Sequence, residues 1–246
     1  MRQIGREFLE KTQYRYLEPS AQERGIPQPP VEARLGDGRL VELPDPATRS
    51  GERPTLYDAI GARRSLREYS DVPLSLPELS ILLWGTQGVS RAIPDRATFR
   101  TVPSAGARHA FETIVLAGRV DGLDPAAYQY LALEHRLVCL DDSPGLPERL
   151  ADACLGQRFI AGAAATFLWV ADRVRMTWRY GERGVRYLFL DAGHVCQNLY
   201  LLAESIGAGA CAIGAFDDER VNGLFGLDGE DRFVVYLAAV GKRAVE

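Results

Sequence analysis

The stretch VRYLFLDAGHVCQNLYLLAESIG, residues 185–207, carries the most information about the fold. Its apolar residues recur at helical spacing over about twenty positions. It ends at Gly207, and glycine is common just beyond a helix because it adopts the left-handed backbone conformation without strain. The pattern therefore predicts one long helix from about Val185 to Ser205.

Apolar strands flank this helix on both sides in the sequence. Thr166–Ala171 is a nearly unbroken apolar run, which is typical of a central strand, and Phe233–Val240 is a second buried strand near the C-terminus. Further strands are predicted at 112–117, 128–131 and 136–140, and the last two look like neighbours in a meander.

Four shorter helices are predicted around these strands from capping residues and apolar spacing. They are Leu56–Arg63, with Leu56, Ala59 and Ile60 on one face; a helix begun by Ser75, Pro77 and Glu78 that stops near Gly85 or Gly88; a helix from Pro147 to about Ala163; and a helix capped by Asp217 or Asp218. Helices and strands interleave without strict βαβ order. We therefore predict an α+β fold with a central sheet covered by helices.

The composition excludes several classes of protein. The chain has 246 residues, of which 46% are hydrophobic and 25% charged, which is ordinary for a soluble globular protein. Its net charge of -4 argues against a nucleic-acid binder, which needs a basic face. No apolar run approaches about 18 residues, so no membrane span is expected. The charged N-terminus lacks the apolar stretch of a signal peptide.

The cysteines and histidines suggest neither a disulfide framework nor a metal site. Cys139, Cys154, Cys196 and Cys211 form no C-x-x-C pair and have apolar or small neighbours. We interpret them as buried free thiols, which fits a reducing cytoplasm. None of the three histidines is spaced from a cysteine as a zinc pair would be, so no metal is expected.

The first 54 residues differ from the rest and hold seven of the 14 prolines. Proline resists both helix interiors and central strands. We therefore divide the chain into a Pro-rich extended N-terminal arm, residues 1–54, and a globular domain, residues 55–246. Two interpretations of the arm are open: a partly disordered leader, or an arm laid over the body or over a partner subunit.

The strongest local signal for chemistry is Arg63-Arg64-Ser65-Leu66-Arg67, where a predicted helix ends. Three guanidinium groups and a hydroxyl within five residues match the donors that hold a phosphate. Each charge-assisted hydrogen bond contributes roughly 1.5–3 kcal/mol. Composition alone favours the alternative, which is a solvated basic face.

Two further segments place polar groups in suggestive positions. Thr101–His109 is a Pro/Ser/Gly loop that would let the backbone approach a flat ligand, or is simply a turn. Asp191, His194 and Asn198 share one face of the long helix, either as a buried network or facing a cleft or subunit boundary; a lone helical histidine such as His194 is usually structural. Residues 207–212 begin like a dinucleotide-binding turn but follow a helix rather than a strand, so we discard that interpretation.

Five segments taken together resemble the nitroreductase superfamily, and within it the SagB-type dehydrogenases. They are RRSLREY (63–69), PSAGARH (103–109), DAGHVCQNLYLLAESIG (191–207), GACAIGAFDDERV (209–221) and VVYLAAVGK (234–242), which stand in the same order and at plausible spacing. The resemblance implies a mostly antiparallel central sheet covered by helices, an intertwined homodimer, and FMN bound at the subunit interface.

The resemblance also implies roles for individual residues. Two basic segments would hold the FMN phosphate and ribityl chain: Arg63, Arg64, Ser65 and Arg67, and, near the C-terminus, Lys242 and Arg243. Polar and small residues would contact the flavin ring: Gln87, Gln157, Ala212, Ile213, Gly214 and Ala215, the last four offering backbone N–H groups near N5. A loop would reach the FMN of the partner subunit: Pro103, Ser104 and Ala105.

One position departs from the family. Members that oxidise azoline rings in modified peptides carry a Lys-Tyr acid–base pair, and the matching residues here are Arg179 and Tyr180. An arginine essentially cannot lose its proton, so Arg179 is a poor base and azoline oxidation is less favoured. Tyr180 would donate a proton to a substrate or orient it, or would be an aromatic packed at the pocket rim.

The resemblance thus favours an FMN-dependent oxidoreductase. Hydride would pass in ping-pong turnover from a donor such as NAD(P)H to a nitroaromatic or quinone. Two alternatives remain open: a dehydrogenase acting on a modified peptide or small natural product, and a flavin-binding partner subunit without turnover.

Overall fold

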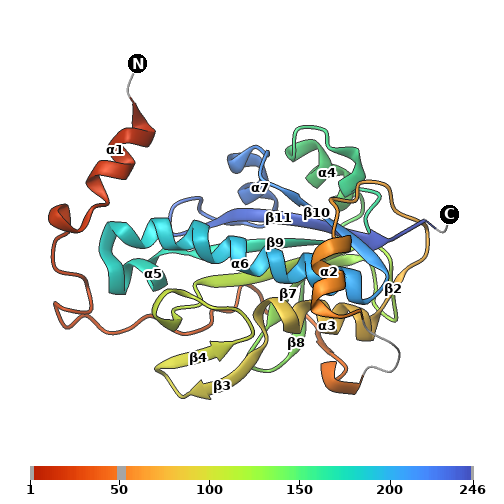
Figure 1. Cartoon of the computed structure of the whole chain (residues 1–246), viewed down its shortest axis with the longest axis horizontal. Coiled ribbons are helices and arrows are strands. Elements are labelled where there is room, and N and C mark those ends of the chain that lie inside the picture. Colours follow the sequence, from red (N-terminus) through yellow and green to blue (C-terminus); the bar gives the residue numbers. More distant parts are fainter. Residues whose placement is uncertain (1–2, 49–53, 245–246) are drawn as a thin grey trace.

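The computed structural model describes residues 3–48 and 54–244, and its centre is a seven-stranded sheet (Figure 1). Its strands, in spatial order, are β1 (Leu40–Glu42), β8 (Arg136–Asp141), β7 (Ala126–Leu131), β5 (Phe111–Ala117), β9 (Ala165–Asp172), β11 (Arg232–Lys242) and β10 (Ala208–Ile213). Every neighbouring pair in this sheet is antiparallel. The predicted mostly antiparallel sheet is confirmed.

Two small sheets accompany the large one. β2 (Leu74–Ser75) pairs with β6 (Val120–Asp121) in parallel, and β3 (Val89–Ile93) forms a hairpin with β4 (Ala97–Arg100). The hairpin projects from the body beneath the long helix (Figure 1).

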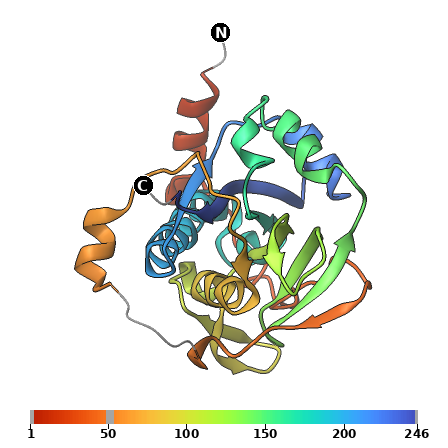
Figure 2. The same cartoon turned by 90° about the vertical axis from the view of Figure 1, so that its right-hand side faces the viewer.

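Helices cover both faces of the large sheet, as predicted for an α+β fold (Figures 1 and 2). Apolar residues of α3 (Leu76–Gln87), α5 (Arg173–Tyr180) and α6 (Gly184–Ser205) join the core on one face, and those of α4 (Leu146–Ala153) and α7 (Asp218–Leu224) join the core on the other. α2 (Leu56–Ala62) contacts α6, and α1 (Ile4–Lys11) begins the N-terminal arm.

β9 is the central strand that its apolar run predicted. It pairs with β5 on one side and with β11 on the other. Phe167 and Trp169 join the α6-side core while Leu168 and Val170 join the opposite core, and all four are fully buried. The strict alternation explains why the strand is apolar at every position: both of its faces are covered.

Three predicted helix boundaries coincide with capping interactions in the structure. The Ser75 hydroxyl accepts the Glu78 N–H and the Glu78 carboxylate accepts the Ser75 N–H, so a capping box begins α3, which ends at Gln87 before Gly88. α6 ends at Ser205, with Gly207 at φ 65°. Asp217 caps α7 by accepting the Arg220 N–H. All three predictions are confirmed.

Two helix predictions need correction. The helix expected from Pro147 to about Ala163 ends at Ala153, because Leu155 and Gly156 take left-handed backbone conformations with φ of 59° and 76° that no α-helix continues. On α2, Leu56 and Ile60 do not face the core of this chain: they are 66% and 56% exposed, and only Ala59 is buried.

β10 was not predicted as a strand. Its sequence, AGACAI, is made mostly of small residues without the β-branched enrichment that signals a strand. All four cysteines are free, as predicted; three are buried and Cys139 is partly exposed. No helix in the described part of the chain has the length and apolarity that a membrane span requires.

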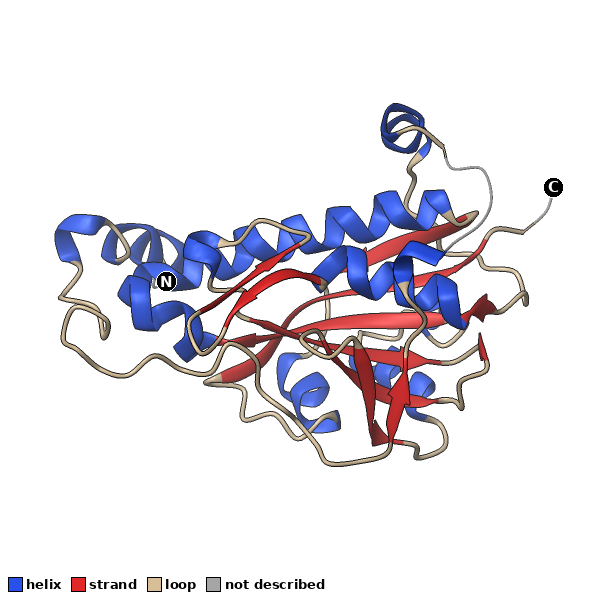
Figure 3. Cartoon of the chain, turned by 90° about the horizontal axis from the view of Figure 1, so that it is seen from below, coloured by secondary structure: helices blue, strands red, loops and turns tan. Residues whose placement is uncertain are grey.

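The described part of the arm lies along the body of its own chain. It begins with α1, passes alongside α5 and runs beneath the sheet before β1 joins the sheet edge (Figure 3). The Gln22 N–H donates to the Trp178 carbonyl at 2.8 Å, and the Trp178 indole donates to the Ile26 carbonyl at 2.8 Å. These bonds fix the arm against α5.

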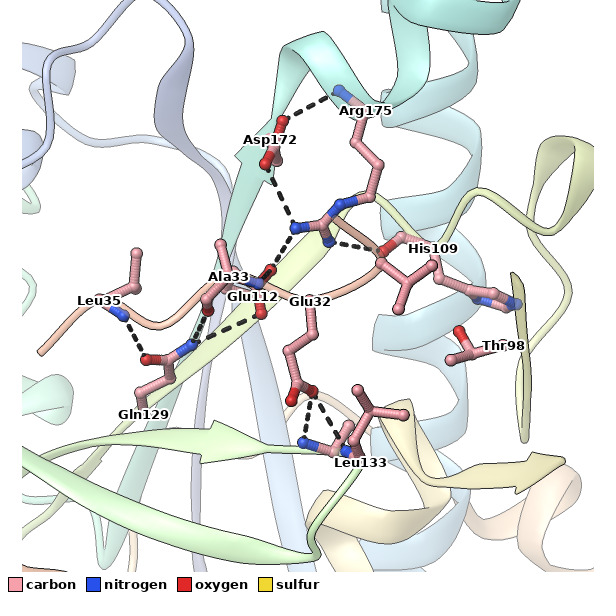
Figure 4. A network of polar contacts seen from close by, with 12 residues as sticks. Glu32, Ala33, Leu35, Thr98, His109, Glu112, Gln129, Leu133, Asp172 and Arg175 are labelled. Carbon is pink, nitrogen blue, oxygen red and sulfur yellow. Dashed lines mark hydrogen bonds and ion pairs between the residues drawn. The ribbon is translucent and has the colours of Figure 1, made fainter. Parts of the chain in front are cut away.

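A buried ion pair joins α5 to the sheet (Figure 4). The Arg175 guanidinium lies 2.6 Å from the Glu112 carboxylate and 3.2 Å from the Asp172 carboxylate. The side chains of Arg175 and Glu112 are 0% and 2% exposed. Arg175 also donates to the His109 carbonyl at 3.1 Å. Burial of these charges is tolerable because they neutralise each other.

The same network holds the arm (Figure 4). Glu112 accepts the Ala33 N–H at 2.8 Å. The Gln129 amide donates to the Ala33 carbonyl and accepts the Leu35 N–H, so it pairs with the arm as a strand would. Glu32 accepts two backbone N–H groups of the β7–β8 turn. The arm between Glu32 and Leu35 is thus hydrogen-bonded to the sheet, with Glu32, Ala33 and Leu35 half-buried.

We expect Arg175→Met to destabilise the protein by about 3–5 kcal/mol, because it leaves the Glu112 carboxylate buried without a counter-charge. Arg173→Met on the same helix is the matched control, since its pair with Asp231 is partly exposed and should be worth at most about 1 kcal/mol. Urea unfolding measures both. Equal losses of unfolding free energy in the two variants would show that the buried ion pair contributes no more to stability than the exposed one.

Candidate functional site

The arginine segment 63–67 lies along the edge strand β10. Ser65 forms a parallel bridge with Ala210, and the Leu66 N–H donates to the Ala210 carbonyl at 2.9 Å. The approach is so close that a Cβ on Gly209 would lie 2.6 Å from the Leu66 side chain. Only glycine fits there, so the small residues that hid β10 from prediction are what let this segment dock.

Tyr200 of α6 connects this segment to the end of β10. Its hydroxyl is 3.0 Å from the Ser65 hydroxyl and accepts the Ala212 N–H at 2.8 Å. The Arg63 guanidinium lies over its ring, 5.2 Å from the centroid. Sequence reasoning assigned Tyr200 no role, since a tyrosine in an apolar helix gives no signal beyond core packing.

The three arginines differ in their surroundings. Arg67 lies over the Phe159 ring at 6.0 Å, and within the described residues neither Arg63 nor Arg67 has an acidic partner. Arg64 turns back and donates to the Gly61 and Arg63 carbonyls. Two unneutralised guanidinium groups on the segment that carries the Ser65 hydroxyl form an arrangement that attracts an anion.

The predicted ring contacts cluster at the end of the same strand. The Gln157 amide donates to the Cys154 carbonyl at 2.9 Å and to the Ala215 carbonyl at 2.8 Å. Ala212 is half-buried and Ile213 buried, whereas Gly214 and Ala215, which follow β10, are exposed. The structure therefore brings together Gln157, residues 212–215 and the arginine segment.

Lys242 and Arg243 lie near this segment, but their charges are used inside the chain. The Ser70 N–H donates to the Lys242 carbonyl at 3.0 Å, which places the two segments side by side. The Lys242 ammonium is 2.5 Å from the Glu78 carboxylate and donates to the Ile206 carbonyl. Arg243 pairs with Glu204.

A second cluster forms around the loop 103–109. The Asp191 carboxylate accepts the Ala105 N–H at 3.3 Å, and the Ser104 hydroxyl accepts the His109 N–H at 2.9 Å. A Cβ on Gly106 would lie 2.3 Å from the Tyr180 hydroxyl and 3.1 Å from the Arg179 side chain. The loop, Tyr180 and Arg179 are therefore in direct contact.

The two clusters occupy different stretches of α6. Asp191 belongs to the second cluster and Tyr200 to the first, and nine helical residues correspond to roughly 13 Å along the axis. Within one chain, the loop Pro103–Ala105 and the segment Arg63–Arg67 therefore lie apart and do not form one site.

The remaining predicted residues separate into buried and exposed groups. Gln87 is buried and accepts from Arg100 at 2.9 Å. Asn198 donates to the carbonyls of Gly85 and Thr101, so it anchors the same loop as Asp191. His194 is exposed. On the helix face predicted for these three residues, Asp191 and Asn198 thus hold the loop, and His194 between them faces outward.

Comparison with known proteins identifies the family. A model of the nitroreductase family matches residues 60–242. A Methanocaldococcus jannaschii protein whose name describes a nitroreductase is 38% identical over 210 residues, covering 85% of this chain and 99% of that protein. The trifolitoxin operon protein TfxC of Rhizobium leguminosarum is 26% identical, covering 89% of this chain and 64% of that protein. The chain belongs to the nitroreductase family and is an oxidoreductase of that family.

Solved structures share the fold. A Ralstonia eutropha protein described as a nitroreductase matches with a TM-score of 0.69 at 24% identity, covering 89% of this chain and 95% of that one. A chain of the Escherichia coli microcin synthetase McbBCD complex gives 0.63 at 19%, covering 97% and 87%. The NADPH:FMN oxidoreductase of Vibrio harveyi gives 0.55 at 17%, covering 77% and 69%.

The Asp191 carboxyl makes stability depend on pH. Burial raises its pKa above the ordinary 3.8, against the opposing hydrogen bonds from Ser104 and Ala105. Its second oxygen is buried without a partner among the described residues. Because the folded state disfavours the charged form, the favourable contribution is present at low pH and is lost as pH rises through the raised pKa.

We therefore expect wild type to lose stability relative to Asp191→Asn as pH rises from about 3 to about 7. Urea unfolding of both proteins across this range measures the difference, and the comparison at the acid end, where both side chains are neutral, is the internal reference. Parallel stability curves would contradict the burial argument.

Proposed function

We propose that the protein is an FMN-dependent oxidoreductase whose flavin lies along β10. The observation that carries the proposal is the pair of unneutralised guanidinium groups, Arg63 and Arg67, on the segment that carries the Ser65 hydroxyl. This donor set fits a phosphate monoester. Family membership supports the same cofactor, since nitroreductases generally bind flavin.

The residues at the end of β10 fit the flavin ring. Both donated hydrogens of the Gln157 amide are used within the chain, which leaves its carbonyl oxygen to accept from a ligand. The exposed backbone at Gly214 and Ala215 has no large side chain to obstruct a flat ring. When bound, the flavin would supply hydride transfer at N5, a chemistry that side chains lack.

Lys242 and Arg243 would take a lesser part in holding phosphate. Each is already paired with a carboxylate, Glu78 and Glu204. An incoming anion would have to compete with those carboxylates. The backbone bond from Ser70 to Lys242 supports a structural role, which is to hold the arginine segment against the sheet.

A homodimer would complete the site. Phe189 and Leu190 expose 55% and 60% of their surface on α6, and Leu56, Tyr57 and Ile60 are likewise exposed on α2. Large exposed apolar groups of this kind mark an interaction surface. A second copy packed there would cover them, and its loop 103–105 would reach the flavin that the first chain holds.

NAD(P)H is the proposed donor, and a nitroaromatic or quinone the proposed acceptor. The likeness to the Vibrio harveyi NADPH:FMN oxidoreductase supports this choice. In the second cluster, Tyr180 would donate a proton to the acceptor or orient it, and Arg179 would bind acceptor oxygen atoms through its N–H groups.

A second candidate is a dehydrogenase acting on a modified peptide, alone or as a subunit of a larger assembly. It is supported by the likeness to the trifolitoxin operon protein and to a chain of the microcin synthetase complex. Arg179 weighs against azoline oxidation, because a guanidinium holds its proton and cannot serve as the base. A flavin-binding subunit without turnover is the remaining alternative.

We expect Arg63→Ala to lower FMN affinity by about tenfold or more, through loss of one charge-assisted contact, with a change in unfolding free energy below about 1 kcal/mol. Released FMN is quantified by fluorescence after denaturation. Arg91→Ala is the control, since Arg91 also lies over an aromatic ring, Phe99, but belongs to the β3–β4 hairpin. Equal losses of stability and flavin would make Arg63 a structural residue.

Anaerobic mixing with NADPH or NADH tests electron transfer. The purified protein is expected to be yellow, and its absorbance near 450 nm should bleach and return on addition of a nitroaromatic or quinone. A yellow protein that no pyridine nucleotide bleaches would favour the peptide dehydrogenase or the non-catalytic subunit. A colourless protein that takes up no added FMN would refute the proposal.

A further inference from the structure

A pocket of about 450 Å³ lies between the N-terminal arm and α5. One wall comes from the arm, with Tyr14, Leu17 and Pro19, and the other wall includes Arg179 and Tyr180. Residues far apart in the sequence therefore share this space, and two of them are the proposed acceptor-binding residues.

Tyr14 is fixed in this wall by contacts with α6. Its hydroxyl is 3.0 Å from the Tyr187 hydroxyl, which also accepts a hydrogen bond from Arg183 at 2.9 Å. The Arg183 guanidinium covers the Tyr14 ring at 4.5 Å. The Tyr187 ring in turn meets the Tyr180 ring edge-on, with centroids 4.9 Å apart. Tyr14 and Tyr180 are thus held by one common neighbour.

The neighbouring arm residues are also anchored. Arg183 donates to the Thr12 carbonyl at 3.0 Å, and Arg186 donates to the Thr12 hydroxyl at 2.5 Å. Ser20 is buried and hydrogen-bonded to Glu23. The segment 14–20 is consequently a defined wall rather than a loose end.

Arg179 is the cation that the pocket offers to a ligand. Its guanidinium lies over the Tyr180 ring at 5.7 Å, and within the described residues it forms no hydrogen bond or ion pair. Two carboxylates also line the pocket. Glu23 accepts hydrogen bonds from the N–H and hydroxyl of Ser20, and Glu18 is exposed, where solvent screens its charge. An anionic group on a ligand would therefore meet Arg179.

The pocket lies beside the loop that would reach the partner's flavin. Gly106 of that loop lies against both Tyr180 and Arg179, so closely that there is no room for a Cβ at this position. A molecule bound between the arm and Arg179 would thus sit next to residues 103–105. This juxtaposition links the pocket to the proposed redox site.

We propose that the arm segment 14–20 forms a wall of the acceptor site, with Tyr14 as a specificity-determining residue, and that this site takes flat aromatic acceptors bearing a carboxylate. The inference rests on the proposed function. The aromatic ring would pack against Tyr14 and Tyr180, and the carboxylate would face the forked donors of Arg179.

Equilibrium binding to the FMN-loaded protein tests this without requiring turnover. The probes are 4-nitrobenzoate and 4-nitrobenzamide, which share a ring and differ in charge, measured by isothermal titration calorimetry. Wild type should bind the benzoate about tenfold more tightly, the value of one charge-assisted hydrogen bond. Arg179→Gln should abolish that preference, whereas Arg173→Gln on the same helix should keep it.

The arm is tested by truncating its aromatic residues. Tyr14→Ala should weaken both probes about fivefold, through lost ring packing, while the preference for charge persists. Tyr16→Ala is the matched control, because Tyr16 lines the adjoining hollow of about 690 Å³, on the other side of the shared segment Leu17–Ser20, and does not line this pocket. If Tyr14→Ala proves too unstable to purify, Leu17→Ala shortens the same wall without removing a side-chain hydrogen bond.

The outcomes separate the two proposals. Equal affinities in Tyr14→Ala and Tyr16→Ala, or a charge preference that survives Arg179→Gln, would overturn the assignment of this pocket even if NADPH reduces the flavin. Conversely, the expected binding pattern in a protein that no donor reduces would support the pocket as a binding site and leave the proposed electron transfer refuted.

Discussion

The candidate site depends on the two hydrogen bonds that the Tyr200 hydroxyl makes. This hydroxyl joins the Ser65 hydroxyl and the Ala212 N–H, at 3.0 and 2.8 Å, and so connects the arginine segment to the strand whose end would meet the flavin ring. Tyr200 is only 9% exposed, and its position is set by the packing of α6 on the sheet. The buried helix therefore shapes the anion-attracting edge, and the arginines supply its charge.

The same helix also explains why one chain holds half of each proposed site. Asp191 and Asn198 anchor the loop 101–105, while Tyr200 serves the arginine segment further along the axis. The apolar groups exposed on α6 and α2 are the surface on which we propose that a second copy packs. On the outer side, the arm closes against α5 and α6, so that a segment outside the matched family region borders the residues proposed to bind the acceptor.

Much of the fold follows from local sequence signals, because each acts within one turn or one strand. The capping box at Ser75, the glycine that ends α6 and the apolar run of β9 are such signals, and all were predictive. Sequence failed at two elements. α4 stops at Ala153 rather than near Ala163, because Leu155 and Gly156 take left-handed conformations that the apolar pattern did not reveal. β10 is a strand because the arginine segment and β11 bond to it, despite its small residues.

The sequence by itself determined which residues carry charge and which segments belong to the family pattern, since both are read from residue types in order. Tertiary structure alone decided which charges are neutralised. Lys242 and Arg243 meet Glu78 and Glu204, 164 and 39 residues away, whereas Arg63 and Arg67 meet no acidic group in the described chain. Coulomb attraction is strong only across a few ångströms, and spacing along the chain does not specify which distant groups come that close.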